Sequence, residues 1–319
     1  MCLYAAPLQG ITTHRFRSLH AEMFGGVDCY FTPFFSPAAE HLMTRGELRD
    51  LTPDHNDTGR VVPQIMTRRG EDFVWAAETL LAMGYRQVNL NLGCPSGTVT
   101  AKGKGAGFLA RPEELEGFLK EIFAALPKGT VSVKTRLGYR EPEEFRRLLE
   151  IYNGLPLREL IIHPRVREDF YKRPVRREDF ARYLPLVQAP VCYNGDLITV
   201  EDCRQFSARF PQVERVMLGR GLAADPALAR KLRGGKAASR EELMEFTGRL
   251  YQGYREDYGG AGPAAQRMKE LWFYLIHLFD GGEKYGRNMR RVAKPREYEE
   301  LEAGIFRDLP LRQEPAGVL

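Results

Sequence analysis

The 319-residue sequence contains only five cysteines, and no two of them form a Cys-x-x-Cys pair. Their odd number and wide spacing indicate neither a disulfide framework nor a zinc site. We therefore expect a reducing compartment, the cytoplasm, and no bound metal ion.

Long apolar runs and a strong charge of one sign are also absent. No segment approaches the roughly 18 apolar residues that cross a bilayer, and no basic stretch followed by an apolar one opens the chain. We expect a protein that is neither exported nor embedded in a membrane. The 47 Lys and Arg residues against 42 Asp and Glu leave a net charge of +5, which permits a polyanionic partner without requiring one.

The sequence does contain a regular alternation of short apolar runs and helical patterns. Eight such runs, each followed by a helical pattern, predict a (β/α)8 barrel, that is, an α/β TIM barrel. A doubly wound open sheet is the alternative, but the Gly-x-Gly-x-x-Gly turn expected after its first strand is missing. The predicted strands are 3–8, 28–34, 61–66, 87–92, 130–136, 159–163, 190–194 and 213–218. The predicted helices are 14–24, 38–50, 71–83, 112–126, 142–153, 177–186, 199–208 and 223–232.

The strand signal ends near Gly234 and Gly235, and only helical patterns follow. We predict a catalytic barrel over residues 1–235, a small all-helical domain over 239–305 and a tail over 306–319. The helices expected in the second domain are 239–257, 264–280 and 284–303. One face of the middle helix should be buried, and it carries Met268, Leu271, Trp272, Leu275 and Phe279.

Active sites of such barrels lie at the carboxyl ends of the strands. Two glycine-rich turns, Asn194–Asp196 and Gly219–Gly221, follow the last two strands, where backbone N–H groups commonly hold a phosphate. Arg220 could add a bidentate contact. Each turn alone could be ordinary, but together they favour a phosphorylated cofactor.

Three further residues at strand ends could take part in chemistry. Lys134 should point its amine into the barrel mouth and seek an anion there. His163 could be a core histidine, a metal ligand or a ring beside a cofactor, with the metal least favoured because no second ligand cluster accompanies it. Cys94 could be an inert core residue, yet it lies at a strand exit. A thiol with a pKa near 8.5 stays protonated at neutral pH and can act as a general acid.

Basic residues gather in three places: at Lys102 and Lys104, between Arg165 and Arg177, and between Lys284 and Arg296. Such runs are most often solvated surfaces. An anionic polymer that spans the barrel mouth and the helical domain would explain all three.

Several motifs in this order resemble the bacterial tRNA-dihydrouridine synthases. They are Ala6-Pro-Leu-Gln-Gly-Ile-Thr, Asn91-Leu-Gly-Cys-Pro-Ser-Gly-Thr-Val, Gly105-Ala-Gly, Val133-Lys-Thr-Arg-Leu-Gly, Tyr193-Asn-Gly-Asp and Met217-Leu-Gly-Arg-Gly. The resemblance covers essentially the whole chain. It departs from the family after the sixth strand, where His163-Pro-Arg-Val replaces the usual His-Gly-Arg-Thr.

The resemblance implies an enzyme that binds FMN at the barrel mouth, uses NADPH as electron donor and holds tRNA partly through its helical domain. Reduced FMN would pass hydride to C6 of a uracil ring and Cys94 would protonate C5. The implied FMN contacts are Pro7, Leu8, Gln9, Gln64, Lys134, His163, Asn194, Gly195, Asp196, Gly219 and Arg220. The substrate contacts that we expect are Asn91, Arg136, Arg165, Lys102, Lys104, Arg287, Arg290 and Arg291. We expect a monomer.

Two other functions remain as alternatives. One is an FMN barrel that acts on a free small molecule, as dihydroorotate dehydrogenase-like proteins do, and the basic helical region speaks against it. The other is a catalytically silent RNA-binding protein. The presence of Cys94, Lys134 and both glycine-rich turns speaks against that reading.

Overall fold

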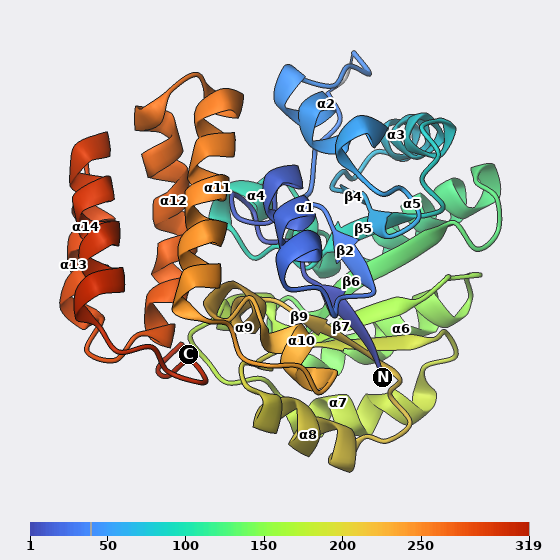
Figure 1. The fold of residues 1–319 in the computed structure, drawn as a ribbon. Coiled ribbons are helices and arrows are strands. Elements are labelled where there is room, and N and C mark those ends of the chain that lie inside the picture. Colours follow the sequence, from blue (N-terminus) through green and yellow to red (C-terminus); the bar gives the residue numbers. More distant parts are fainter. Residues whose placement is uncertain (39, 319) are drawn as a thin grey trace. The chain divides into compact units, whose positions relative to one another are not determined.

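The computed structural model describes residues 1–38 and 40–318, in which short strands alternate with helices along the chain (Figure 1). All eight predicted strands are present, and the predicted strand 61–66 is divided at Pro63 into β3 and β4, so that the described residues form nine strands. Their bounds are β1 Cys2–Ala5, β2 Cys29–Phe31, β3 Val61–Val62, β4 Gln64–Ile65, β5 Val88–Leu92, β6 Val131–Gly138, β7 Leu160–Val166, β8 Val191–Asn194 and β9 Arg215–Leu218.

The strands form one sheet in the order β3-β2-β1-β9-β8-β7-β6-β5-β4. Only Pro63 separates β3 from β4 in the chain, although these two segments stand at opposite ends of that order. The run that contains them pairs in parallel with β2 on one side and with β5 on the other. The sheet therefore closes on itself, and the predicted barrel is confirmed.

Helices follow the strands close to their predicted positions. They are α1 His14–Met23, α2 Arg45–Leu51, α3 Gly70–Ala82, α5 Pro112–Ala125, α6 Phe145–Asn153, α7 Arg177–Tyr183, α8 Val200–Arg209, α9 Arg220–Ala224 and α10 Leu228–Leu232, with the short α4 Gly97–Thr100 inside a loop. The predicted start of the helix over 38–50 is wrong. Thr44 and Glu47 form a capping box that begins α2 at Arg45.

Strands β6 and β7 both run further than predicted, to Gly138 and Val166. Lys134 and His163 consequently lie within strands instead of at their ends. The register between the two strands shifts after the pair Arg136 and His163, which marks a β-bulge. Pro164 lies in this irregular stretch, where its missing N–H breaks no regular ladder.

The carboxyl-terminal region is all helical, as predicted. It contains α11 Arg240–Tyr258, α12 Ala261–Leu275, α13 Glu283–Arg291 and α14 Pro295–Asp308. The single helix expected over 284–303 is wrong, because Lys294 is extended before Pro295 and the chain starts a new helix there. All five side chains of the predicted buried face are at most 3% exposed, and four of them lie on α12. The predicted helix end at 280 is wrong, because α12 ends at Leu275 and Phe279 is extended.

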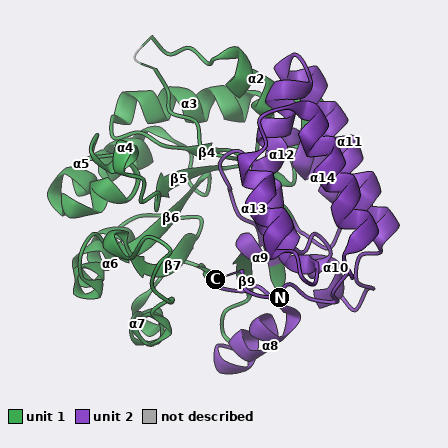
Figure 2. Cartoon of the chain, turned by 90° about the vertical axis from the view of Figure 1, so that its left-hand side faces the viewer, with its two compact units in different colours: residues 1–2, 29–195, 212–217 green, residues 3–28, 196–211, 218–319 purple. Residues whose placement is uncertain are grey.

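The chain divides into two compact units, which are coloured separately in Figure 2. Unit 1 comprises residues 1–2, 29–195 and 212–217, and it holds most of the strands. Unit 2 comprises residues 3–28, 196–211 and 218–319, and it holds β1 and the four carboxyl-terminal helices. Within the described residues, no helix combines the length and the apolar character that crossing a membrane requires.

Candidate active site

A chain of side-chain hydrogen bonds crosses the inside of unit 1 between β4, β5 and β6. The Gln64 amide donates to Asn89 Oδ1 at 2.7 Å and accepts from Asn91 Nδ2 at 2.7 Å, while Asn89 Nδ2 donates to Ser132 Oγ at 2.8 Å. These four residues are at most 7% exposed. Because buried amides need partners, this network holds Asn91 in one orientation.

Asn91 in turn fixes the loop that carries the candidate catalytic cysteine. Its Oδ1 accepts the backbone N–H groups of Gly93 and Cys94, both at 3.0 Å. Gly105, with φ of +56°, packs so closely on this loop that a Cβ there would lie 2.9 Å from the Cys94 carbonyl oxygen. The motif residues Asn91, Cys94 and Gly105 thus pack together and fix the conformation of a single loop.

The electrostatic surroundings of Cys94 keep its thiol protonated. Burial raises the pKa of Cys94, and the cations of Arg136 and Lys134 lower it by less. Burial, with the neighbouring Arg136, lowers the pKa of Lys134 to about 8. A protonated thiol therefore lies in the same part of unit 1 as an amine whose pKa is close enough to neutral pH for its charge to change with its surroundings.

Arg136, in β6, connects the loop after β5 with the end of β7 and the loop that follows it. Its Nε donates to the Gly93 carbonyl at 2.8 Å, and its Nη1 donates to the carbonyls of Val166 at 2.9 Å and Phe170 at 3.0 Å. The remaining Nη2 is buried and has no hydrogen bond of normal geometry among the described residues. The Tyr171 side chain is a neighbouring hydrogen-bond partner of Arg136, and a polar group of a ligand at this position can pair with Nη2 as well.

Tyr171 was missed by the sequence analysis. Its side chain is 52% exposed, and its ring centroid lies 5.2 Å from the Arg136 guanidinium, 6.0 Å from that of Arg165 and 5.8 Å from the His163 ring. Arg165 also donates from Nη1 to His163 Nε2 at 2.9 Å. The available signal was an aromatic residue inside the basic stretch between Arg165 and Arg177.

Asp169 organises the loop that presents Tyr171. Its carboxylate accepts from the Val166 N–H at 3.0 Å and from both Arg176 Nε and Nη2, at 2.9 and 3.0 Å. Burial works to raise the pKa of Asp169, but these hydrogen bonds outweigh it and the pKa is lowered. The loop therefore contains a permanently charged buried carboxylate at neutral pH.

The first glycine-rich turn has the backbone that a phosphate cradle needs. Gly195 has φ of +155° and a Cβ there would lie 2.8 Å from Val175, while Asp196 has φ of +46°. Asn194, just before, donates from Nδ2 to the Met217 carbonyl at 2.8 Å. The conformation at Gly195 is one that only glycine adopts without strain.

In unit 2, Arg220 forms an ion pair with Asp196, and both side chains are largely buried. Gly219 precedes Arg220, and a Cβ at Gly219 would lie 3.4 Å from Ala6. The predicted phosphate clamp therefore has an orienting carboxylate, which the sequence analysis had counted as a separate cofactor contact. Pro7, Leu8 and Gln9 lie in the loop after β1, where Leu8 donates its N–H to Thr12 Oγ1 at 2.8 Å.

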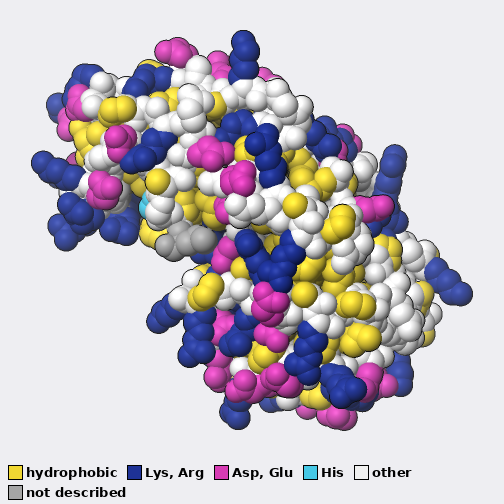
Figure 3. Space-filling model, turned by 90° about the horizontal axis from the view of Figure 1, so that it is seen from below, with side chains coloured by type: hydrophobic (Ala, Val, Ile, Leu, Met, Phe, Trp, Pro, Cys, Tyr) yellow, Lys and Arg dark blue, Asp and Glu magenta, His cyan; other side chains and the backbone are white. Residues whose placement is uncertain are grey.

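The predicted RNA-contacting residues are mostly exposed. Lys102 is exposed, Lys104 is half-buried, and burial lowers the pKa of Lys104. On the face drawn in Figure 3, Lys and Arg side chains are interspersed with Asp and Glu. Exposed basic residues alone therefore do not mark a binding face in this protein.

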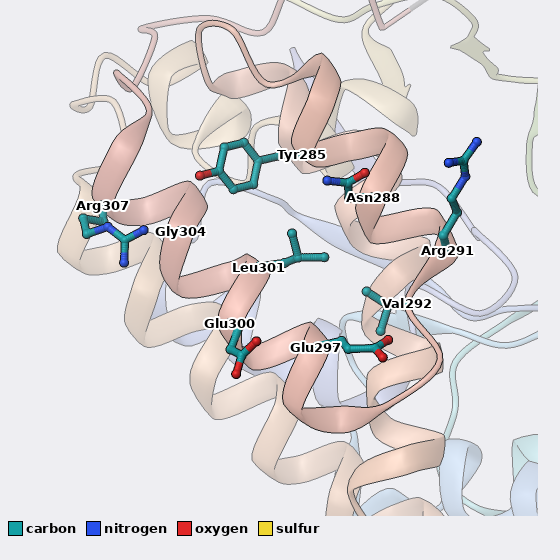
Figure 4. Close-up of a pocket in the computed structure, with 9 residues that line it drawn as sticks. All are labelled: Tyr285, Asn288, Arg291, Val292, Glu297, Glu300, Leu301, Gly304 and Arg307. Carbon is teal, nitrogen blue, oxygen red and sulfur yellow. The ribbon is translucent and has the colours of Figure 1, made fainter.

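Arg287, Arg290 and Arg291 are all exposed on α13, but their surroundings differ. The Arg290 guanidinium lies 6.0 Å from the Phe273 ring centroid. Arg291 lines a pocket of about 480 Å³ together with Glu297 and other residues of α13 and α14, and its guanidinium points away from them (Figure 4). The three arginines do not act as one cluster.

Comparison with known proteins identifies the family. The profile described as "Dihydrouridine synthase (Dus)" matches residues 4–308. The chain belongs to the dihydrouridine synthase family. It is 30% identical over 297 residues to the "tRNA-dihydrouridine(16) synthase" of Pseudomonas putida, covering 86% of this chain and 88% of that one. It is 31% identical over 250 residues to the protein of the same name from Ralstonia nicotianae, covering 74% and 73%.

A solved structure of a morphinone reductase mutant in complex with tetrahydroNAD has a similar fold, with a TM-score of 0.53 over 77% of this chain and 90% of that one at 12% identity. Family membership confirms the predicted flavin oxidoreductase with FMN as cofactor and NADPH as electron donor. The residues present fit that cofactor: Lys134 is a buried cation, Arg136 has a buried donor, and Gly195 leaves no room for a side chain. Among the described residues, no group of three or more His, Cys, Asp or Glu could hold a metal ion.

Proposed function

We propose that this chain reduces the C5–C6 double bond of uridine in tRNA to give dihydrouridine. The observation that carries the proposal is the Cys94 loop, in which a thiol with a raised pKa is held by Asn91 and Gly105 close to Lys134 and Arg136. Saturating a uracil ring requires one hydride and one proton. FMN, when bound, supplies the hydride that adds to C6.

Cys94 supplies the proton in this proposal. Its Sγ–H donates to C5 as the hydride reaches C6, and the thiolate that remains takes a proton from solvent before the next turnover. Asn91 sets the position of the loop. In this proposal it therefore positions both the general acid, Cys94, and the uracil ring of the substrate. Arg136 Nη2 offers an N–H to a carbonyl of the uracil or of the flavin.

The other predicted contacts have narrower roles. The flavin contacts that we propose in unit 1 are Lys134, His163, Gly195 and Gln64. Those that we propose in unit 2 are Arg220, Asp196 and the loop Pro7–Gln9. Arg165 would contribute to substrate binding by holding the side chains of His163 and Tyr171 in position. Lys102, Lys104 and the arginines of α13 would meet tRNA phosphates.

The relatives named above are tRNA enzymes that act at position 16. We therefore propose tRNA as the substrate and position 16 as the modified uridine. We further propose that residues 1–235 form the catalytic barrel and 239–305 the tRNA-binding domain, that the protein acts as a monomer, and that it works in the cytoplasm.

The test is to map dihydrouridine in total tRNA from a strain that lacks this gene, and from the same strain expressing either the wild type or Cys94→Ala. We expect dihydrouridine to disappear from one position in the deletion strain and to return only with the wild type. An unchanged map would overturn the proposal. Turnover on free uridine as fast as on folded tRNA would instead favour the small-molecule alternative.

A further inference from the structure

A second pocket, of about 400 Å³, lies within unit 2. It is lined by residues of the loop after β1 and of helices α12 and α13, and its polar and aromatic lining includes Gln9, Gln266, Lys269, Glu270, Phe273 and Arg290. Its size falls within the range of about 300–1,000 Å³ that is usual for ligand sites. The proposed reaction uses none of the residues that α12 contributes.

An exposed aromatic ring, that of Phe273, lines this pocket. The Phe273 side chain is 46% exposed, although the Tyr274 ring meets it edge-on at 4.9 Å and the Arg290 guanidinium lies 6.0 Å from its centroid. A ring that is fixed by neighbours yet half exposed is the platform on which proteins stack unpaired bases.

The polar groups around Phe273 are held in fixed positions. Lys269 Nζ donates to Gln266 Oε1 at 3.0 Å and to the Val292 carbonyl at 2.7 Å. Glu270 accepts from Arg267 Nη1 at 3.1 Å, and its second carboxylate oxygen lies against Gly10, where it leaves no room for a Cβ. Ordered amides and a carboxylate of this kind can pair with the edge of a base.

The charge of the pocket suits a phosphate. Lys269 and Arg290 are cationic, and the single carboxylate, Glu270, is already paired with Arg267. Arg290 forms no ion pair that the structure records within residues 1–38 and 40–318. A guanidinium that is exposed and close to an aromatic platform can contact the phosphate of a stacked nucleotide.

We propose that this pocket holds one unpaired nucleotide of the tRNA other than the uridine that is reduced, with its base on Phe273 and its phosphate at Arg290. The proposal rests on the proposed function, because it takes folded tRNA as the substrate. A second anchored nucleotide fixes the register of the RNA, so that only one uridine can reach Cys94. It also explains why free uridine should be a poor substrate.

The experiment measures binding, so that it does not depend on turnover. tRNA transcripts carrying 2-aminopurine at single unpaired positions are titrated with the FMN-loaded wild type, Phe273→Leu and Phe273→Trp. Met244→Ala is the matched control, since Met244 is a 50% exposed apolar residue on α11. Thermal unfolding and FMN content establish that each variant is folded.

We expect the fluorescence at one position, distinct from the target uridine, to change on binding to the wild type. Phe273→Leu should abolish that change and raise the Kd by about tenfold, whereas Phe273→Trp and Met244→Ala should behave as wild type. If Phe273→Leu binds as tightly as Met244→Ala with the same fluorescence changes, the pocket holds no nucleotide, and the proposed function stands. If the wild type binds no tRNA at all, both proposals are wrong.

Discussion

The stretch from Arg165 at the end of β7 to Arg177 at the start of α7 is rich in arginine, and so is helix α13, yet their side chains have opposite surroundings. Arg165 is 2% exposed and hydrogen-bonded to His163, and Arg176 is held by the buried Asp169. The arginines of α13 are exposed, and the structure records no ion pair for them within the part of the chain that it describes. The same residue type thus positions a site in one region and remains available for docking in the other.

This contrast divides the expected effects of substitutions. Changes in the buried region of unit 1 should alter chemistry, because polar groups such as Asn91 and Asp169 are held there by fixed partners. Changes on α13 should alter RNA affinity and its salt dependence, because exposed cations act through counterion release. A substitution on α13 that alters the chemical step, or one in the buried region that alters only RNA affinity, would show that burial does not predict the role of a residue in this protein.

The largest effect is expected for Cys94→Ala. Removing a general acid slows the step that it assists by roughly 10²–10⁴, so single-turnover reduction of tRNA should slow by that factor while FMN remains bound. Cys29→Ala is the matched control, since Cys29 lies in β2 and burial raises its pKa to about 12. Unchanged single-turnover rates in Cys94→Ala would remove this thiol from the mechanism.

A smaller effect is expected for Arg220→Ala. A charge-assisted contact to the FMN phosphate contributes about 1.5–3 kcal/mol, and its loss would also leave Asp196 buried without its ion-pair partner. FMN should dissociate more readily, as measured by flavin fluorescence on dilution. Arg220→Lys should recover part of the affinity, and equal FMN affinity in all three proteins would place the phosphate elsewhere.

The salt dependence of tRNA binding tests the exposed region. Replacing Arg287, Arg290 and Arg291 together with Ala should lower the slope of log affinity against log salt by about two to three units, since each phosphate contact contributes about 0.7–0.9. The charge-matched control replaces Lys120, Arg147 and Arg182, which are exposed and paired with glutamates on the barrel helices. Equal slopes for the two triple variants would make α13 a solvated surface.

Much of this molecule was predictable because its signals are local. The eight strands follow from short apolar runs, and Pro112 marks a helix start that the structure confirms. The folded loop that carries Cys94 was predictable from its motif. The break at Pro295 was also marked in the sequence, but the continuing helical pattern on both sides concealed it.

The remainder depends on partners from distant segments. Arg136 can be buried inside β6 only because carbonyls of Gly93, Val166 and Phe170 accept its N–H groups, and these lie on two other segments of the chain. Tyr171 becomes part of the site through the same arginine. No pattern in the neighbouring sequence specifies such contacts, so strand lengths and the role of Tyr171 could not be predicted.

The smallest effect concerns pH, and it distinguishes the loop after β7 from helix α14. Burial raises the pKa of Glu302 on α14, whose carboxylate accepts from the Tyr298 hydroxyl at 2.7 Å. The pKa of Asp169 is lowered instead. The stabilisation from Asp169 is therefore present at neutral pH and lost as the pH falls through its folded-state pKa. The stabilisation from protonated Glu302 is present at acid pH and lost as the pH rises through its folded-state pKa.

Glu302→Gln imitates the protonated carboxyl at every pH, and its amide oxygen can still accept from Tyr298. We expect the variant to match the wild type in thermal midpoint near pH 4.5, the ordinary value for this group. At pH 8 the variant should be the more stable of the two proteins, because the wild type must then bury a charge. Glu300→Gln, an exposed residue of the same helix paired with Arg296, should show no such pH dependence. A constant difference between Glu302→Gln and the wild type from pH 4.5 to 8 would mean that Glu302 keeps the same protonation in the folded and unfolded states, and that burial in the helical region does not control it.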